Sequence, residues 1–400
     1  MSIVLLNWKG GEYDTFTYFN TCMKQAFERM GRPTQIVNLD NQALHELSEL
    51  HNKGIDFVFT WQGLGSQLGA TETNPVTIWD HLKVPLLCYH GDHPCQMILN
   101  HKAASRWARH IYATPSFAMF ANTYIPRTSV ATFFPTPNWF PDGVKSRFEG
   151  DFFVFPKNIN DLDVTLDEWR KAPQRRLAGF LLAAADAIIG EFRNGNRTNH
   201  HDIIDAMLNA EVMTALCGEL GNPPELSVRF HVHMLLDKVH RNTIAEHVIN
   251  ELQDVPLKIY GWGWERFRLR NNPHHEFLPF DAMSDNAFQY ASQYGILDVA
   301  PIHDALHDRT LRAMGNRAGF LIGSDWPYET FLGGDCGDLF FDGADGALRA
   351  KAERVMQSPE AHRTRCRDFA QRYQQQFSFF NFFKYLEGVS ATIRASAAIA

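Results

Sequence analysis

The chain has 400 residues, more than a single hydrophobic core usually organises, so we expect two lobes. With 45% hydrophobic and 21% charged residues it has the composition of a globular protein, and a net charge of -7 gives no general attraction for nucleic acid or anionic lipid. Scattered cysteines without a C-x-x-C pair argue against a structural zinc site or a disulfide scaffold and predict a cytoplasmic protein. The longest apolar stretch, 177–189, is shorter than the ~20 residues of a membrane span, so no integral span is expected.

Residues 1–145 alternate short apolar runs with longer amphipathic segments, such as the helical pattern over 16–30. This alternation is typical of a parallel, doubly wound sheet and predicts a Rossmann-like lobe on the acceptor side. Polar, glycine-containing loops, 7–11 and 90–94, follow the first and last runs. Because ligands bind at the carboxyl ends of parallel strands, we expect both loops at one edge of a cleft. The expected strands are 3–6, 35–39, 55–60 and 84–89.

A stretch rich in proline, glycine and aromatic residues, 133–151, suits a connection between lobes. The pattern is then mainly helical from 166 to 252, which predicts a helical insertion over about 165–252. A second α/β series predicts a Rossmann-like lobe over 146–375, insertion included, and a C-terminal segment, 376–400, that crosses back to the first lobe. The expected elements are strands 256–260, 295–300, 320–323 and 339–341, a helix over 307–318, helical spacing over 347–373, and an aromatic helix over 377–386.

The segment after residue 294 has the pattern of a strand, a polar loop, a helix that contains Arg309, a small-residue turn and an apolar strand. Here the sequence resembles the C-terminal glycosyltransferase module of the CgeB-like, spore-maturation-type family, most clearly over 256–385. The resemblance implies an α/β GT-B fold, with two Rossmann-like lobes that face a central cleft, and sugar transfer from a nucleotide-diphosphate donor without an essential metal or other cofactor. The matching pieces are Arg309 with Thr310, 313–315, 319–322 and 339–342, supported by 259–264 and 84–87.

Arg309 stands near the start of the helix expected over 307–318, with Thr310 beside it. A nucleotide diphosphate gains charge as the glycosidic bond breaks, and an enzyme without a metal must neutralise that charge with helix N-termini, backbone amides and Arg or Lys side chains. Within the family motif we therefore expect Arg309 and Thr310 to bind the pyrophosphate. Taken alone, Arg309 would be interpreted as a surface arginine at a helix start.

One position departs from the family pattern. The family places a glutamate on this helix to bind the ribose hydroxyls, and Arg312 occupies the aligned position. Asp308 is a candidate substitute for that contact, and Arg312 is a candidate to bind an extra phosphate or carboxylate on an unusual donor. Loss of activity is a further alternative.

The residues Tyr260, Gly261 and Trp262 follow the strand expected over 256–260. Glycine at a strand end lets the backbone approach a ring, and aromatic side chains can stack on a nucleobase. We therefore expect these residues to form the nucleobase wall of the donor site. Core packing of both Trp262 and Trp264 is the alternative, and the sequence favours neither.

The loop after the fourth expected strand contains His90, Asp92 and His93, at a position where GT-B enzymes often keep a residue that faces the sugar and the acceptor. A carboxylate or an imidazole can take the acceptor proton when its pKa lies near the working pH. We rank Asp92 first and His93 second, and Glu12 and Asp14 remain competing candidates. The spacing in this loop also allows a metal, but the proline that follows and the lack of a nearby partner motif argue against one.

Two further histidine sets, His200 and His201 with Asp202, and His231 with His233, fall in the helical insertion. The sequence offers no cysteine or carboxylate at metal spacing beside them, so we expect solvated or hydrogen-bonded side chains. No metal ligand is therefore predicted.

The leading hypothesis is glycosyl transfer from a nucleotide sugar, which serves as co-substrate, to an acceptor that the sequence does not identify: a saccharide, a protein or a small molecule. Homodimerisation is left open. The alternative is a non-catalytic nucleotide- or sugar-binding protein of two lobes, which the missing glutamate suggests. A nicotinamide-dependent oxidoreductase is a third hypothesis, but Gly10 and Gly11 are only a fragment of its G-x-G-x-x-G motif, and we keep both as candidate donor-binding residues.

Overall fold

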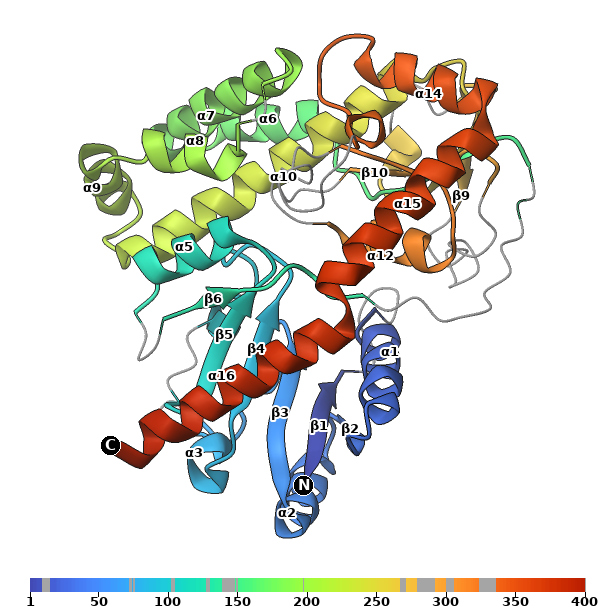
Figure 1. Cartoon of the computed structure of the whole chain (residues 1–400). Coiled ribbons are helices and arrows are strands. Elements are labelled where there is room, and N and C mark those ends of the chain that lie inside the picture. Colours follow the sequence, from blue (N-terminus) through green and yellow to red (C-terminus); the bar gives the residue numbers. More distant parts are fainter. Residues whose placement is uncertain are drawn as a thin grey trace. The chain divides into compact units, whose positions relative to one another are not determined.

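Two parallel β-sheets organise the chain in the computed structural model (Figure 1). The chain divides into two compact units, the first formed by Met1–Trp139 with Tyr373–Ala400 and the second by Phe140–Arg372. The expected α/β class, with two parallel sheets and many helices, is confirmed. The structure describes residues 1–8, 15–71, 74, 76–101, 105–126, 130–138, 148, 150–196, 198–266, 271–278, 292–299, 306–323 and 336–399.

The first sheet has the strand order β2-β1-β3-β4-β5-β6, and every neighbouring pair is parallel. Its central strands are almost fully buried apolar runs, as expected for a parallel sheet that is covered on both faces. Because the strands are parallel, β1 and β4 both end at the carboxyl edge of this sheet. The strands are β1 Ser2–Asn7, β2 Thr34–Asn38, β3 Ile55–Trp61, β4 Leu86–His90, β5 Ala108–Tyr112 and β6 Thr132–Phe133.

The helices of the first unit begin where side chains satisfy their first backbone amides. Thr114 Oγ1 accepts a hydrogen bond from the Phe117 amide at 3.0 Å, and Pro115 occupies the first turn of α5. Thr77 and Asp80 form a capping box at the start of α3. The helices are α1 Thr15–Arg29, α2 Ala43–Lys53, α3 Ile78–Leu82, α4 Ile98–His101, α5 Pro115–Tyr124 and α16 Phe379–Ile399.

The C-terminal helix α16 lies across the first sheet, where it contacts β4, β5 and α1 (Figure 1). Its aromatic side chains supply the apolar part of this contact: the Phe382 ring packs edge-on against Tyr89, with the ring centroids 5.5 Å apart, and the Phe383 ring lies 5.0 Å from that of Phe27. Offset and edge-on aromatic pairs add about 0.5–1.5 kcal/mol beyond the area that they bury. The aromatic composition of this segment therefore serves packing.

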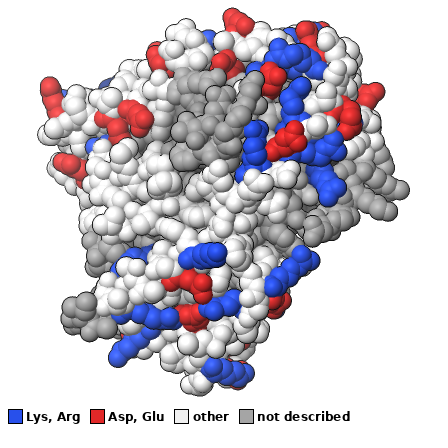
Figure 2. Space-filling model, viewed as in Figure 1, with Lys and Arg blue, Asp and Glu red and all other residues white. Residues whose placement is uncertain are grey.

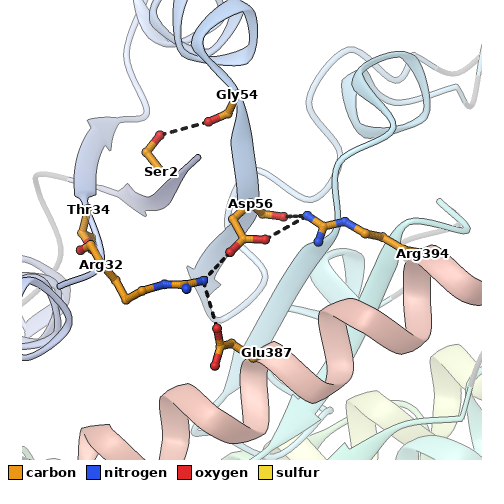
Figure 3. A network of polar contacts seen from close by, with 7 residues as sticks. All are labelled: Ser2, Arg32, Thr34, Gly54, Asp56, Glu387 and Arg394. Atoms are coloured by element: carbon orange, nitrogen blue, oxygen red, sulfur yellow. Dashed lines mark hydrogen bonds and ion pairs between the residues drawn. The ribbon is translucent and has the colours of Figure 1, made fainter. Parts of the chain in front are cut away.

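Ion pairs hold the same helix at the amino end of β3 (Figure 3). Asp56 Oδ2 lies 2.7 Å from Arg32 Nη2, and Asp56 Oδ1 lies 3.0 Å from Arg394 Nη2. Arg32 also pairs with Glu387 at 2.9 Å, and Arg394 donates a hydrogen bond to the Asp56 carbonyl. One carboxylate of the sheet is thereby linked to two positions on α16.

The second sheet has the strand order β11-β10-β7-β8-β9, again with every neighbouring pair parallel. Gly295 begins β10 with a φ of +95°, and a Cβ there would lie 2.2 Å from the Gly319 carbonyl oxygen, so only glycine fits. The strands are β7 Phe153–Pro156, β8 Leu257–Tyr260, β9 His275–Leu278, β10 Gly295–Asp298 and β11 Phe320–Ile322.

A helical insertion separates β7 from β8 in the sequence, as predicted. Its last helix, α10, has 27 residues and is buried on several faces, because its first half packs among the insertion helices and its second half packs on the second sheet. The insertion helices are α6 Leu162–Lys171, α7 Arg175–Arg193, α8 His200–Met207, α9 Ala210–Glu219 and α10 Glu225–Glu251. Later elements of the second unit are η2 Trp264–Arg266, α12 Asp308–Gly315, η4 Gly337–Leu339, α14 Ala347–Gln357 and α15 Pro359–Phe377, within which the unit boundary falls.

Two expected elements differ from the structure. The strand expected over 339–341 is wrong: the chain forms the 3₁₀ turn η4, and Phe340 meets β11 only in a single bridge to Ile322. The helical spacing over 347–373 is interrupted at Ser358, because Pro359 lacks an amide proton and begins a new helix. Within the described part of the chain, no helix is both long and apolar enough to cross a membrane.

Candidate functional site

The carboxyl edge of the second sheet gathers buried charged groups around the start of α12. Asp298, the last residue of β10, is fully buried, and its Oδ2 accepts hydrogen bonds from the Thr310 hydroxyl at 2.7 Å and the Thr310 amide at 3.2 Å. A carboxylate at a helix N-terminus is favoured by the helix dipole and satisfies amides that have no partner within the helix. Asp298 therefore fixes where α12 begins.

Arg309 and its neighbours form a chain of ion pairs on the same turn. Arg309 Nη1 lies 3.7 Å from Asp298 Oδ1, and His307 Nδ1 lies 2.6 Å from Asp308 Oδ1, so that imidazole donates to the carboxylate. Burial alone would raise the pKa of Asp308, but His307, and then Arg309 and Arg312, outweigh burial and hold the pKa well below its ordinary range. Arg312 Nε lies 3.9 Å from Asp308 Oδ2, and only 3% of the Arg312 side chain is exposed.

Lys157 is a buried lysine that directly follows β7 at this edge. Burial, Arg241 and Arg309 hold the pKa of Lys157 well below its ordinary value, against the opposing effects of Asp237 and Asp298. Lys157 is therefore within electrostatic range of both ion pairs, Arg309 with Asp298 and Arg241 with Asp237. Among the described residues of this region, the basic groups are Lys157, Arg241, Arg309 and Arg312, and the carboxyl groups are Asp237, Asp298 and Asp308.

The loop after β8 lies directly against the backbone that follows β7. A Cβ at Gly261, which has a φ of +152°, would lie 2.3 Å from the Lys157 carbonyl oxygen. The Trp262 amide donates to Asn158 Oδ1 at 3.1 Å, and Trp264 Nε1 donates to the Lys157 carbonyl at 2.7 Å. Trp264 is buried in the core, whereas 47% of Trp262 is exposed. Core packing therefore describes Trp264, and only Trp262 has a surface on which a ring could stack.

Tyr260 ends β8 beside this loop and is partly buried. Burial and, to a smaller extent, Glu276 raise the pKa of its phenol, so the hydroxyl is neutral at physiological pH and can donate a hydrogen bond. The edge of the second sheet thus combines cationic side chains with an exposed indole and a phenol.

In the first unit, His90 ends β4 and is completely buried. Its Nε2 lies 2.8 Å from His110 Nδ1, and its ring stacks on those of His110 and Tyr112. His101, on α4, hydrogen-bonds through Nδ1 to the Tyr112 hydroxyl and through Nε2 to the Gln96 carbonyl, both at 2.9 Å. Three buried imidazoles therefore pack together at the carboxyl edge of the first sheet.

Asp92 and His93 differ in exposure and partners. Asp92 is partly exposed, and its Oδ2 accepts a hydrogen bond from Gln62 Nε2 at 2.6 Å. Gln62 follows β3 with a φ of +52°, which a residue other than glycine adopts only at some cost. His93 is buried; its Nδ1 accepts from the Cys95 amide at 3.1 Å, and its ring packs edge-on against two phenylalanines.

A network of amide side chains at the end of β1 was not anticipated from the sequence. Asn7 Nδ2 donates to Asn38 Oδ1 at 3.0 Å, and Asn20 Nδ2 donates to Asn7 Oδ1 at 3.2 Å and to the Leu6 carbonyl. Trp61 Nε1 donates to Asn20 Oδ1 at 2.9 Å. These bonds fix the ends of three neighbouring strands and of α1.

The structure brings some of the predicted site residues together. Asp308, Arg309, Thr310 and Arg312 share one helical turn, and Tyr260, Gly261 and Trp262 lie beside Lys157. Gly10, Gly11, Glu12 and Asp14 lie outside the described residues. Sequence reasoning missed Lys157 and Asp298, each of which stands at the carboxyl end of a parallel strand; that position was the available signal.

Basic side chains also gather over α14 and α15 on the face drawn in Figure 2, with carboxylates among them. Arg349 pairs with Asp254 and with Glu353, and Glu360 pairs with Arg363 and Arg367. An exposed pair such as Arg349 with Asp254 contributes about 0–1 kcal/mol. On this face the positive side chains are interspersed with negative ones.

No family model and no curated protein sequence matches the chain. Among solved structures, T4 phage BGT in complex with its UDP-glucose substrate aligns with 99% of this chain and 98% of its own, with a TM-score of 0.48 and 9% identity. Anabaena Alr3699/HepE in complex with UDP and glucose aligns with 98% of this chain and 100% of its own, with a TM-score of 0.45 and 11% identity. An alpha-glucosyltransferase in complex with UDP and a 13-mer DNA has the same two coverages and TM-score, with 9% identity.

Proposed function

We propose that the chain is a glycosyltransferase of the GT-B class that binds the diphosphate of a nucleotide sugar at the carboxyl edge of its second sheet. The observation that carries the proposal is the juxtaposition of Lys157 and Arg309 at the start of α12, beside the exposed Trp262. The resemblance of the segment around Arg309 to the CgeB-like family supports the same assignment.

Charge is the first argument for a diphosphate ligand. Burying Lys157 near Arg309 is costly, because burial and the charge of Arg309 both disfavour the protonated form of Lys157. Asp298 offsets part of this cost through its ion pair with Arg309. The same carboxylate accepts a hydrogen bond from the Thr310 hydroxyl, so we assign Thr310 to positioning α12 and Arg309 to binding the ligand. A diphosphate would supply the missing negative charge, and the same cations would stabilise it as the glycosidic bond breaks, without a metal ion.

The nucleoside would lie against the loop after β8. Trp262 exposes a large aromatic surface, and the glycine at position 261 lets that loop run close to the backbone after Lys157. We assign Trp262 to stacking on the base and Asp308, which stays ionised, to the ribose hydroxyls. Arg312, which stands at the position of the family's glutamate, pairs with Asp308. We assign it to orienting the Asp308 carboxylate, which then takes the glutamate's role.

The first unit would supply the acceptor chemistry. We assign Asp92 as the general base that takes the acceptor proton, because its carboxylate is partly exposed and is oriented by Gln62. His93 is the second candidate, although its Nδ1 is already occupied by the Cys95 amide. Glu12 and Asp14 remain competing candidates.

The test is donor binding by Arg309→Gln, measured by calorimetry with UDP and UDP-glucose, the ligands present in the three solved structures. Loss of one charge-assisted contact is expected to weaken binding by about 10- to 100-fold. The matched control is Arg317→Gln, an exposed arginine two residues beyond the C-terminal end of the same helix, which should bind like the wild type. Equal affinities in both variants would contradict the proposal.

A second assay separates an enzyme from a binding protein. A thermal-shift panel of UDP-, GDP-, TDP- and CMP-sugars selects the donor, and NAD in the same panel tests the oxidoreductase alternative. The stabilising donor is then incubated with the protein, with and without EDTA, and its hydrolysis or transfer is measured. Consumption that persists in EDTA supports a metal-independent transferase, whereas binding without consumption indicates a non-catalytic protein. A cytoplasmic location is part of the proposal.

A further inference from the structure

A cluster of buried histidines and aspartates lies where α8 packs on α10 in the helical insertion. Between 0 and 5% of each of four imidazoles is exposed, in a region whose other buried residues are apolar. Burying polar groups is costly unless they are hydrogen-bonded or bind a ligand. The cluster consists of His200 and His201 on α8 and His233, Asp237 and His240 on α10.

The carboxylate of this cluster comes from α10, far along the sequence from the two histidines of α8. Residues four positions apart lie on one face of a helix, and Arg229, His233, Asp237 and Arg241 follow this spacing. The two α8 histidines meet this face, so the carboxylate beside them lies 36 or more residues away in the sequence. Of the two states expected from the sequence, solvated or hydrogen-bonded, the structure shows the second for His200, His201 and His233, which are buried and hydrogen-bonded.

Asp237 divides its two oxygens between different partners. Its Oδ2 accepts from Arg241 Nε at 2.7 Å, and its Oδ1 lies 3.2 Å from His200 Nε2. Burial alone would raise the pKa of Asp237, but Arg241 and His200 outweigh it and keep the carboxylate ionised. In the absence of an ion, a proton on His200 Nε2 therefore bridges the imidazole and the carboxylate.

Hydrogen bonds also fix the orientation of His201. His233 Nε2 lies 3.1 Å from Asp205 Oδ1, so this nitrogen donates to the carboxylate and His233 Nδ1 is left as an acceptor. His201 Nδ1, 2.9 Å from His233 Nδ1, must then carry the proton, which leaves the lone pair of His201 on Nε2. A histidine that donates one ring proton to an orienting partner and offers the other nitrogen is the usual arrangement of a metal ligand.

We propose that His200, His201 and Asp237 bind a divalent ion of the zinc class, which ties α8 to α10. The three residues offer ligand atoms that all lie within 4.8 Å of one another. Two ligands placed about 2.0–2.2 Å from one tetrahedral ion are about 3.3 Å apart, close to the 3.2 Å between His200 Nε2 and Asp237 Oδ1. Two imidazoles and a carboxylate suit zinc better than calcium or magnesium, which prefer oxygen ligands.

Metal binding displaces the proton that lies between His200 and Asp237. The ion takes the place of the His200 Nε2 proton beside Asp237 Oδ1; from the imidazolium form this proton leaves to solvent, and from the neutral form it moves to Nδ1. Arg241 stays on Oδ2, and His233 with Asp205 orients His201 from behind. Because the ligands are almost fully buried, the ion has a structural role.

A second histidine group competes for this assignment within the described residues: His90, His101 and His110 also offer ligand atoms within 4.8 Å of one another. There, however, both ring nitrogens of His101 already have hydrogen-bond partners, and no carboxylate belongs to the group. Binding a cation would break two hydrogen bonds without an anionic ligand in return. The geometry therefore favours the insertion.

The first test is metal content and binding by the full chain. The protein is stripped with a chelator, titrated with Zn²⁺, and compared with Asp237→Asn and His200→Gln, each of which removes a ligand. One equivalent is expected for the wild type, together with a rise in Tm. Both variants should lose more than about 100-fold in Zn²⁺ affinity, which is the upper end of the loss typical when a residue that only orients a ligand is changed. His231→Gln, an exposed histidine of the same helix, is the matched control and should bind like the wild type.

Two further measurements keep the test decisive if a ligand variant fails to fold. Co²⁺ bound to the wild-type protein should show the visible absorption of a tetrahedral site, and Zn²⁺ should displace it. His233→Gln, which leaves all three ligands in place, should weaken binding by about 10- to 100-fold. Absence of stoichiometric binding, or loss of the ion in His101→Gln but not in His233→Gln, would overturn the proposal.

Discussion

The carboxyl edges of the two sheets hold different buried polar groups. At the first edge, Asn7 and Asn20 exchange hydrogen bonds between amides, and His90 packs on other imidazoles. At the second edge, Lys157 and Asp298 are buried as ionisable groups. A buried amide needs only a hydrogen-bond partner, whereas a buried charge needs an opposite charge to offset its lost hydration. The amides at the first edge are thus satisfied by their neighbours, whereas the second edge gains most from an anionic ligand.

This difference predicts that the two edges fail in different ways when they are mutated. Changes at the second edge should alter ligand affinity and the pH dependence of stability. Changes at the first edge should alter turnover or local order, with donor affinity preserved. The substitutions below test this division, beginning with the largest expected effect.

The largest effect is expected for Asp92→Asn, at the first edge. The substitution keeps the hydrogen bond to Gln62 within reach but removes the proposed base, so kcat should fall by about 10²- to 10⁴-fold. Donor affinity, measured by calorimetry, should stay unchanged. Asp40→Asn, in the turn after β2, is the control of equal charge and should keep full turnover. A normal kcat together with weakened donor binding in Asp92→Asn would contradict this assignment and place donor binding at the first edge.

Lys157→Met, at the second edge, should weaken UDP binding by about 10- to 100-fold, because a charged contact to the diphosphate is lost. Lys258→Met on β8, where the lysine is partly exposed and pairs with Glu276, is the matched control and should bind UDP normally. If both variants bind like the wild type, Lys157 does not face the ligand.

The same variant sharpens the comparison through pH. The pKa of Lys157 is lowered in the folded protein, so between that pKa and the ordinary value of 10.5 the unfolded chain binds more protons and stability rises with pH. The free energy of unfolding of the wild type should therefore rise relative to that of Lys157→Met as the pH approaches 10.5. Urea denaturation at a series of pH values measures this; a constant difference would show that Lys157 titrates normally.

The sequence predicted the elements whose apolar runs are long. The strands β1, β3 and β4 are five to seven buried residues each and were assigned, whereas β5 was missed because Arg109 and His110 interrupt its pattern. The strand β7 has four residues, ends in a proline, and follows a stretch of prolines and glycines that resembles a connection. Short strands are formed here by pairing with neighbours, which no local pattern records.

The missed strand explains the missed residue. Lys157 becomes a candidate only when β7 is known to end at Pro156, because the carboxyl-end rule then applies to it. Arg309 was found through a motif that lies within one helix and needs no tertiary information. The two interpretations of Trp262 and Trp264 likewise depended on burial, which differs between residues two positions apart.

Thr310→Val tests how strongly the second edge depends on its buried carboxylate. The isosteric change removes the hydroxyl that donates to Asp298 at 2.7 Å, and a hydrogen bond to a charged group contributes about 1.5–3 kcal/mol. The free energy of unfolding should fall by about 2 kcal/mol. Thr214→Val, on the exposed side of α9, loses only a bond to a backbone carbonyl and should change stability by less than about 0.5 kcal/mol. Equal losses in both variants would mean that the buried charge has no special weight.

The smallest effect is expected where charges are exposed, in the network of Figure 3. Asp56→Asn removes one ion-pair partner from Arg32, which keeps Glu387, and the carboxylate partner of Arg394; the two arginine side chains are 37% and 42% exposed. Because water screens such pairs, the loss should be about 1 kcal/mol in low salt and smaller in 1 M NaCl, where the Debye length is about 3 Å. A double-mutant cycle with Arg394→Gln in urea denaturation isolates the coupling of that pair. A coupling of about 3 kcal/mol or more that persists in high salt would be the size expected for a buried ion pair. That result would contradict the difference drawn here between exposed and buried pairs.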